Sequence, residues 1–312
     1  MTSAFIQVTD RCQLRCKYCF YSTGYLEYSK EATLISITDM INFLISMKIE
    51  NVIITGGDPL HPSVIKETLE LTKTLRAIGI DVSIDTALIV RGNEILSELI
   101  DLQLSMMYVS CDSHHPEVHN KQRGLWDKTI YSIKKLIDAG VPVYINCSVT
   151  SLNFSEIKET RKFFINMGVN DIDFHTAYIP KNAKHFKELS CENLSSIDKK
   201  KLCQNLLWCA SGNEKKVAYC LFQIRWLFDS ETYVPMKFSC KMGKDFIVID
   251  RHGVVTPCFH LPCWGNTSEV SIIKKNKEIV EEKGFDCIES KCLSLFAIDS
   301  FCEGRNSCGE NK

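Results

Sequence analysis

Residues 9–21, "TDRCQLRCKYCFY", carry three cysteines directly after a short apolar run that is typical of a β-strand. Cys12, Cys16 and Cys19 are therefore predicted to lie on a loop at the carboxyl end of a first strand. Three thiolates at a spacing of four and then three residues can bind one side of a metal centre, but a four-coordinate metal would lack a ligand. They fit a [4Fe–4S] cluster with one open iron, and a structural zinc site is the alternative.

The composition is that of an ordinary globular protein. The chain has 312 residues, of which 45% are hydrophobic, and its formal net charge is −1, so no global field points to nucleic acid or a membrane as partner. The first ten residues lack a secretory signal, and no apolar run approaches the ~20 residues of a membrane helix. Sixteen cysteines in such a chain favour metal ligands or reactive thiols over disulfides. We therefore expect a cytoplasmic protein.

The first 180 residues alternate between short β-branched runs and segments with helical periodicity. One helical face over 37–45 is expected to contain Ile37, Met40, Ile41, Leu44 and Ile45, and another over 126–137 is expected to contain Trp126, Ile130, Ile133 and Ile137. Six strand-then-helix units in series predict an α/β fold with a parallel sheet, a partial (β/α)6 barrel of the TIM type. The six expected strands are "AFIQVT" (4–9), "NVIIT" (51–55), "IDVSID" (80–85), "MMYVSC" (106–111), "VYINCSV" (143–149) and "DIDFHT" (171–176).

The pattern changes after Pro180. Residues 195–228 read as helix with a break at Gly212 and Asn213, and "DFIVIDRHGVVTPC" (245–258) reads as a β-hairpin. The last fifty residues have little periodicity but continue to supply cysteines, so a metal would be needed to order them. We expect a barrel over 1–180, a helical connection over 181–235 and a small hairpin-plus-helix domain over 236–312.

The CxxxCxxC spacing after the first strand resembles the signature of the radical S-adenosylmethionine (radical SAM) superfamily. "TGGDP" (55–59) resembles the family's stretch beside the methionine amino group, which implies that Gly56, Gly57 and Asp58 lie there. The resemblance implies that SAM binds the open iron through its amino and carboxylate groups. Its reductive cleavage would give a 5′-deoxyadenosyl radical.

The resemblance continues along the barrel. "SCDS" (110–113) and "HNKQRG" (119–124) are similar to the ribose-facing strand end and the carboxylate-binding arginine of the family. It departs at residues 85–88, where "DTAL" stands in place of Thr-Asn-Gly, so the contacts of that loop are left open. The residues that it implies for SAM are Ser110 and Asp112 for the ribose, Arg123 for the carboxylate, Asn146 and Ser148 from the fifth strand, and Tyr18 beside the adenine.

A second set of cysteines resembles the auxiliary-cluster domains called SPASM and twitch. Cys240, then twelve residues, Gly253, four residues and Cys258 match their opening hairpin. Cys287 and Cys292 are similar to the later pair, which implies one auxiliary [4Fe–4S] cluster with four ligands. A structural zinc is the alternative, and Cys302 and Cys308 could substitute as ligands.

The resemblance implies a radical SAM enzyme that abstracts a hydrogen atom from a ribosomally made peptide and installs a crosslink or an epimerised residue. Cys263 is then a candidate hydrogen-atom donor, or equally an alternative cluster ligand. A radical SAM dehydrogenase of a small metabolite of the sugar-alcohol type is the main alternative, and a zinc-stabilised binding module is the non-enzyme one. Because Cys12 leaves no room for an N-terminal leader-binding domain, a separate leader-recognition protein or docking on the helices around 190–228 is expected. A flavodoxin or ferredoxin would supply electrons.

Overall fold

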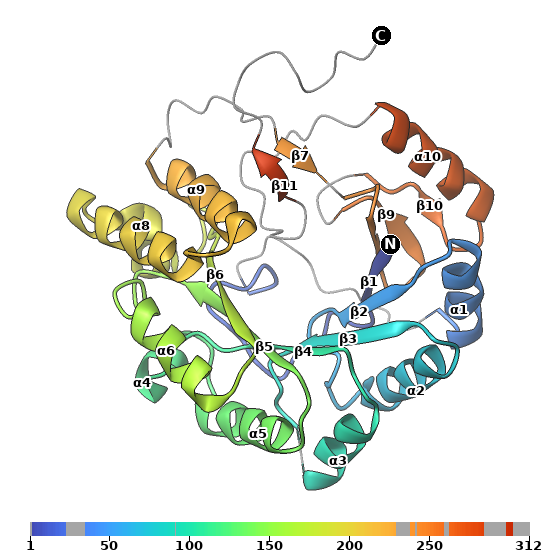
Figure 1. The fold of residues 1–312 in the computed structure, drawn as a ribbon, viewed down its shortest axis with the longest axis horizontal. Helices are drawn as coiled ribbons and strands as arrows, with labels where there is room; N and C mark the ends of the chain where they lie inside the picture. The colour runs from blue at the N-terminus through green and yellow to red at the C-terminus, as the bar shows by residue number, and fades with distance from the viewer. Residues whose placement is uncertain are drawn as a thin grey trace.

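A nine-stranded sheet forms the centre of the molecule, in the order β10-β9-β8-β1-β2-β3-β4-β5-β6 (Figure 1). It is seen in a computed structural model, which describes residues 2–22, 35–90, 92–228, 238–240, 242–258, 262–283 and 298–301. Six of its strands are parallel neighbours that follow one another along the chain. They are β1 (Ser3–Gln7), β2 (Asn51–Thr55), β3 (Asp81–Thr86), β4 (Met106–Ser110), β5 (Val143–Val149) and β6 (Asp171–Thr176). The predicted α/β class, the six strands and the partial barrel are confirmed.

Helices surround the outer face of this sheet (Figure 1). Ser36 and Ser195 cap α1 and α8, since each hydroxyl accepts a 3.1 Å hydrogen bond from the backbone N–H three residues on. The predicted helix over 195–228 is confirmed as two helices that break at Gly212 and Asn213. The bounds are α1 (Ile37–Ser46), α2 (Ile65–Ala77), α3 (Asn93–Asp101), α4 (Pro116–Gln122), α5 (Trp126–Asp138), α6 (Ile157–Met167), α7 (Phe186–Leu189), α8 (Ser196–Ala210) and α9 (Glu214–Phe228), with a 3-10 turn at Cys191–Asn193.

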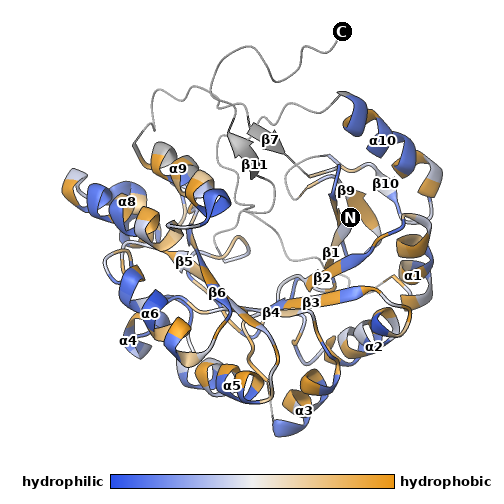
Figure 2. Ribbon diagram, viewed as in Figure 1, coloured by the Kyte–Doolittle hydropathy of each residue, from blue (hydrophilic) through white to orange (hydrophobic). Residues whose placement is uncertain are grey.

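The core lies between the strands and the inner faces of the helices. Figure 2 shows hydrophobic residues along the strands and on the sheet-facing sides of the helices, with hydrophilic residues outside. In α5, Ile130 and Ile133 are fully covered, as the periodicity predicts. In α1 the expected apolar face is wrong at one position: Ile45 is 56% exposed, and Phe43 is buried together with Met40 and Leu44.

The segment after the barrel adds to the same sheet. In the predicted hairpin, β8 (Phe246–Ile249) pairs parallel with β1, and β9 (Val254–Thr256) pairs antiparallel with β8. Gly253 has a φ of +78° at the hairpin turn, and a side chain there would collide with Thr267 and Ile35. The remaining elements are β10 (Gly265–Asn266), α10 (Val270–Lys283) and the two-stranded sheet of β7 (Phe238–Cys240) with β11 (Ile298–Phe301).

Among the described residues, no helix combines the length and the apolarity that crossing a bilayer needs.

Candidate functional site

The cysteine loop lies at the carboxyl end of β1, as predicted. Cys16 is buried, whereas Cys12 and Cys19 are half-buried. The side chain of Gln13 donates two 3.0 Å hydrogen bonds, to the carbonyls of Leu60 and Ile89, which follow β2 and β3. The loop is therefore fixed to the ends of two neighbouring strands. The apolar side chains of the cysteine loop pack in a cluster separate from the main core. This cluster consists of Leu14, Cys16, Tyr18, Ala87, Ile89, Ala177, Ile179 and Leu189.

Gly56 and Gly57 pack the loop after β2 against the cysteine loop. The N–H of Gly57 donates a 2.6 Å hydrogen bond to the carbonyl of Thr9, and the N–H of Asp58 donates a 2.8 Å bond to the carbonyl of Arg11. A Cβ on either glycine would fall well inside van der Waals distance of these carbonyl oxygens, and Gly56 also has a φ of +141°. The close approach of the two backbones thus serves the packing of the cysteine loop. Contact of these glycines with SAM stays a prediction.

Cys12, Cys16 and Cys19 lie close enough to interact electrostatically. Three thiols in one loop fit a [4Fe–4S] cluster with one open iron, whereas a tetrahedral zinc site needs a fourth ligand. Burial raises the pKa of Cys12 to about 11 and that of Cys16 to about 12, so these thiols depend on a bound metal to become thiolates.

Asp112, which follows β4, joins the cysteine loop, α4 and β5. Its side chain is completely buried. Oδ2 accepts hydrogen bonds from the Tyr18 hydroxyl at 2.5 Å, from Gln122 at 3.1 Å and from Nε of Arg123 at 3.1 Å. Oδ1 accepts from Nη2 of Arg123 at 3.2 Å and from the N–H of Ser148 at 3.1 Å. This shell, led by the charge of Arg123, outweighs desolvation and lowers the pKa of Asp112.

These contacts bear on the SAM assignments. A carboxylate has about four lone-pair sites, and five protein donors already engage Asp112, so a ribose contact would have to displace one of them. Arg123 is 11% exposed at its side chain and stands 5.5 Å from the centre of the Tyr18 ring. Its Nη1 makes no hydrogen bond within the described part of the chain, which leaves one face of the guanidinium for a carboxylate. The assignments of Asp112, Arg123 and Tyr18 stay predictions.

Asp58 connects the loop after β2 to the loop after β3. It is fully buried, and its Oδ1 accepts a 2.6 Å hydrogen bond from Thr86 and a 3.0 Å bond from the N–H of Leu60. Its Oδ2 accepts a 3.4 Å bond from the N–H of Ala87. Burial nevertheless raises the pKa of Asp58. The "DTAL" loop, whose contacts the sequence left open, is thus held by Asp58.

The remaining SAM candidates line the inside of the barrel. Along β5, Tyr144, Asn146 and Ser148 are half-buried, while the residues between them are buried against the helices. Ser110 on β4 is half-buried and lies opposite Asn146. Ser110, Asn146 and Ser148 therefore sit together at the carboxyl ends of two adjacent strands, where the resemblance implies the cofactor.

The second cysteine set is only partly within the described residues. The backbone of Cys240 ends β7, and half-buried Cys258 follows β9. Cys263 is exposed and lies shortly before β10. Cys287, Cys292, Cys302 and Cys308 lie outside the described residues. The auxiliary cluster and the role of Cys263 stay predictions.

The hairpin also contacts the cysteine loop through a buried ion pair that sequence reasoning missed. Nη1 of Arg251, in the β8–β9 turn, lies 3.0 Å from Oδ1 of Asp10, and both side chains are 8% exposed.

Sequence reasoning also missed Gln122 and Thr86, which donate hydrogen bonds to Asp112 and Asp58. In the sequence, Gln122 could have been found only by its position next to Arg123. Thr86 could have been found because it lies in "DTAL", the stretch that departs from the Thr-Asn-Gly of the family.

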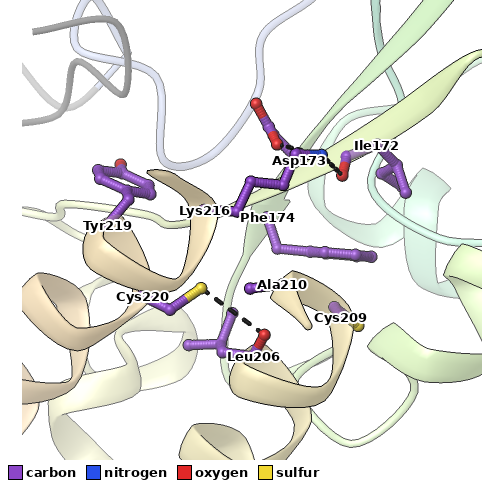
Figure 3. Close-up of a pocket in the computed structure, with 9 residues that line it drawn as sticks. All are labelled: Ile172, Asp173, Phe174, Leu206, Cys209, Ala210, Lys216, Tyr219 and Cys220. Carbon is purple, nitrogen blue, oxygen red and sulfur yellow. Dashed lines mark hydrogen bonds and ion pairs between the residues drawn. The ribbon is translucent and has the colours of Figure 1, made fainter. Parts of the chain in front are cut away.

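A small cavity of about 20 Å³ lies between β6, α8 and α9, with room for one water molecule (Figure 3). Its lining is mostly apolar and includes Phe174, Leu206 and Cys220. None of the predicted SAM or cluster residues lines it. The cavity is a packing defect rather than part of the site.

The comparisons with known proteins agree with this geometry. A model of the family described as the radical SAM superfamily matches residues 6–164, about half of the chain. The chain is 31% identical over 162 residues to a GTP 3',8-cyclase of Alkaliphilus oremlandii, covering 49% of each chain. It is 30% identical over 174 residues to that of Nautilia profundicola, covering 53% of this chain and 52% of the relative. The chain thus spans about half the length of these curated relatives.

Solved structures resemble the chain over more of its length. Native anSMEcpe with bound AdoMet and Cp18Cys peptide has a TM-score of 0.64 at 18% identity and covers 95% of this chain and 88% of its own. Streptococcus suis SuiB bound to precursor peptide SuiA has a TM-score of 0.62 at 16% identity, with 86% and 63% covered. These likenesses show a shared fold. From the family match over residues 6–164 and the cysteine loop at the end of β1, we conclude that the chain belongs to the radical SAM superfamily, whose members use S-adenosylmethionine and a [4Fe–4S] cluster.

Proposed function

We propose that this radical SAM enzyme modifies a ribosomally made peptide, by a crosslink or an epimerisation. The observation that carries the proposal is the extent of the structural likeness. The structural match to anSMEcpe, which was solved with a peptide, covers 95% of this chain, and the structural match to SuiB, which was solved with precursor peptide SuiA, covers 86%. A likeness of this extent takes in most of the chain that follows the barrel.

The residues of the chain have separate tasks in this proposal. Cys12, Cys16 and Cys19 hold the [4Fe–4S] cluster, which supplies the electron that cleaves SAM into methionine and a 5′-deoxyadenosyl radical. Nη1 of Arg123 binds the SAM carboxylate, and Asp112 fixes the guanidinium in a bidentate pair. Gly56, Gly57 and Asp58 border the amino group, Ser110 the ribose and Tyr18 the adenine, and β5 offers Asn146 and Ser148 beside them. The apolar cluster around the loop keeps water and other hydrogen donors away.

Cys240, Cys258, Cys287 and Cys292 are proposed to hold one auxiliary [4Fe–4S] cluster, which would supply electron transfer. Anaerobic reconstitution should then give about eight irons per chain. A content of about four irons plus one zinc would contradict the auxiliary cluster, but it would leave the assignment of the radical SAM cluster intact.

The proposal is tested by co-expression with the short reading frames beside the gene, followed by mass spectrometry of the peptides. A crosslink removes two hydrogen atoms, and an epimerisation in deuterated water replaces one α-hydrogen with deuterium. Cys16→Ala is the inactive control. If no encoded peptide changes while the purified enzyme converts a small metabolite, the peptide assignment is wrong.

Nucleotide cyclisation is a second candidate, because the curated relatives are named GTP 3',8-cyclase. A triphosphate needs several cations. Within the described barrel interior, Arg123 pairs with Asp112 and Lys216 pairs with Asp171 and Asp173. Incubation of the reduced enzyme with SAM and GTP tests this candidate, and a cyclised nucleotide would favour it over the peptide.

A further inference from the structure

We propose that Asp85 binds a positively charged group of the substrate inside the barrel, next to the residues assigned to the ribose of SAM. The identification of that group as a basic side chain of a peptide rests on the proposed function. The position and the sign of the charge rest on the structure alone.

The position follows from the register of the sheet. Val82, Ile84 and Thr86 of β3 are buried, whereas Ser83 and Asp85 are half-buried and face the barrel interior. Asp85 lies opposite Tyr108 on β4, which lies opposite Tyr144 on β5. Ser110 and Asn146 are the next inward-facing residues toward the carboxyl ends of those strands. Asp85 is therefore about one residue pair deeper than the ribose-facing positions.

The charge of Asp85 is poorly compensated by the protein. Its oxygens accept two long hydrogen bonds from neutral groups, at 3.4 Å each, from Asn146 and from Thr55. In the described part of the chain no lysine or arginine forms an ion pair with it. Desolvation raises its pKa to about 6, although Arg123 is near enough to oppose the shift. A carboxylate enclosed without a cation is costly, and a cationic ligand removes that cost.

Asp173 provides the contrast inside the same barrel. Nζ of Lys216 lies 2.8 Å from an oxygen of Asp173 (Figure 3). The same Nζ lies 2.8 Å from an oxygen of Asp171. Asp171 and Asp173 therefore have a protein cation, whereas Asp85 has none among the residues that the structure describes.

The walls beside Asp85 also suit a basic side chain. The rings of Tyr108 and Tyr144 lie 5.5 Å apart between centroids and offer a surface for the methylenes of a lysine or arginine. Nζ of Lys216 lies 5.1 Å from the centroid of Tyr144, so this wall already accommodates one ammonium group. A phosphate or carboxylate group would be repelled by Asp85.

The test uses the full chain, reconstituted and loaded with SAM, and three probes of the same length: n-butylammonium, 1-butanol and butyrate. Calorimetry should show saturable binding of n-butylammonium alone. Asp85→Asn should weaken that binding by about tenfold or more, which corresponds to the loss of one charge-assisted contact. Asp85→Glu should restore part of it, and Asp101→Asn, on the exposed end of α3, is the matched control.

Equal binding of n-butylammonium to the parent protein and to folded Asp85→Asn would overturn the proposal, as would preferential binding of butyrate. Because the measurement involves no turnover, it separates this inference from the proposed function. Modified peptide without n-butylammonium binding rejects the role of Asp85 alone. Binding at Asp85 in an enzyme that cyclises GTP rejects the peptide function alone.

Discussion

Asp112 and Asp85 are interior carboxylates at the ends of adjacent strands, and they differ in what surrounds them. Five donor groups from four residues, two of the groups belonging to the bidentate Arg123, enclose Asp112 and lower its pKa. Asp85 has two long contacts with neutral groups, and its pKa is raised to about 6. The comparison indicates that Asp112 stabilises the fold and orders the cofactor residues, whereas Asp85 is available to bind a ligand.

The largest effect is expected at Asp112. Asp112→Ala leaves the guanidinium of Arg123 enclosed without its partner, and breaking such a pair costs about 3–5 kcal/mol of unfolding free energy. Urea unfolding of the two proteins measures this cost. Asp101→Ala, at an exposed position, should change the unfolding free energy by less than about 0.5 kcal/mol. If Asp112→Ala lowers the unfolding free energy by less than about 1 kcal/mol, water can solvate Arg123 in place of Asp112, and the predicted cost is wrong.

The next effect concerns the contact between the cysteine loop and the loop after β2. Gly57→Ala forces the two backbones apart, and such overpacking costs about 1–3 kcal/mol. Iron content after reconstitution should fall along with the melting temperature. Gly79→Ala is the control for lost stability without a clash, because Gly79 has a φ of +84°, which strains an alanine, while a Cβ there would have no neighbour within 4 Å. Equal iron content in the two variants would mean that the close approach is not needed for the cluster.

The third prediction uses the raised pKa of Asp85. A carboxyl group with a raised folded-state pKa stabilises the fold below its unfolded pKa of about 4 and loses that contribution as the pH rises through about 6. Asp85→Asn removes the loss, so it should be more stable than the parent at pH 7.5, by roughly 1–2 kcal/mol after solvent screening. At pH 4 the two proteins should be equal. Urea unfolding at both pH values checks this, and a destabilised Asp85→Asn at pH 7.5 would assign Asp85 a structural role.

The smallest effect is expected at Cys263, which is exposed. Cys263→Ala should change the unfolding free energy by less than about 0.5 kcal/mol. Its iron content and peptide products distinguish the two proposed roles. Full iron with an altered product supports hydrogen-atom donation, and lost iron makes Cys263 a ligand. Unchanged iron and products would dismiss both.

The parts of the fold that local patterns encode could be predicted from the sequence. Each of the six strands has a buried face of β-branched and other apolar residues, and the cysteine spacing placed the first site at the end of β1. The pairing of β8 with β1 was not predictable, because it joins segments about 240 residues apart in the chain. Ile45 was misplaced because periodicity alone does not determine which side of an apolar stripe meets the sheet.

The same limit applies to the site. Asp112, Arg123 and Tyr18 were found by their positions in motifs, but their mutual contacts depend on three elements that meet only in the folded chain. Asp85 drew attention solely as a departure from a motif. That no lysine or arginine of the described residues pairs with Asp85 follows only from the folded arrangement of the neighbouring strands.

The most direct test compares Asp112→Asn with Asp85→Asn in one assay, the formation of 5′-deoxyadenosine from SAM by the reduced enzyme without substrate. Asp112→Asn should require at least tenfold more SAM or lose the activity, because Arg123 and Tyr18 lose their common partner. Asp85→Asn should cleave SAM about as well as the parent protein, since its role is in substrate binding. Unchanged cleavage by Asp112→Asn together with impaired cleavage by Asp85→Asn would contradict the division of roles between the two carboxylates.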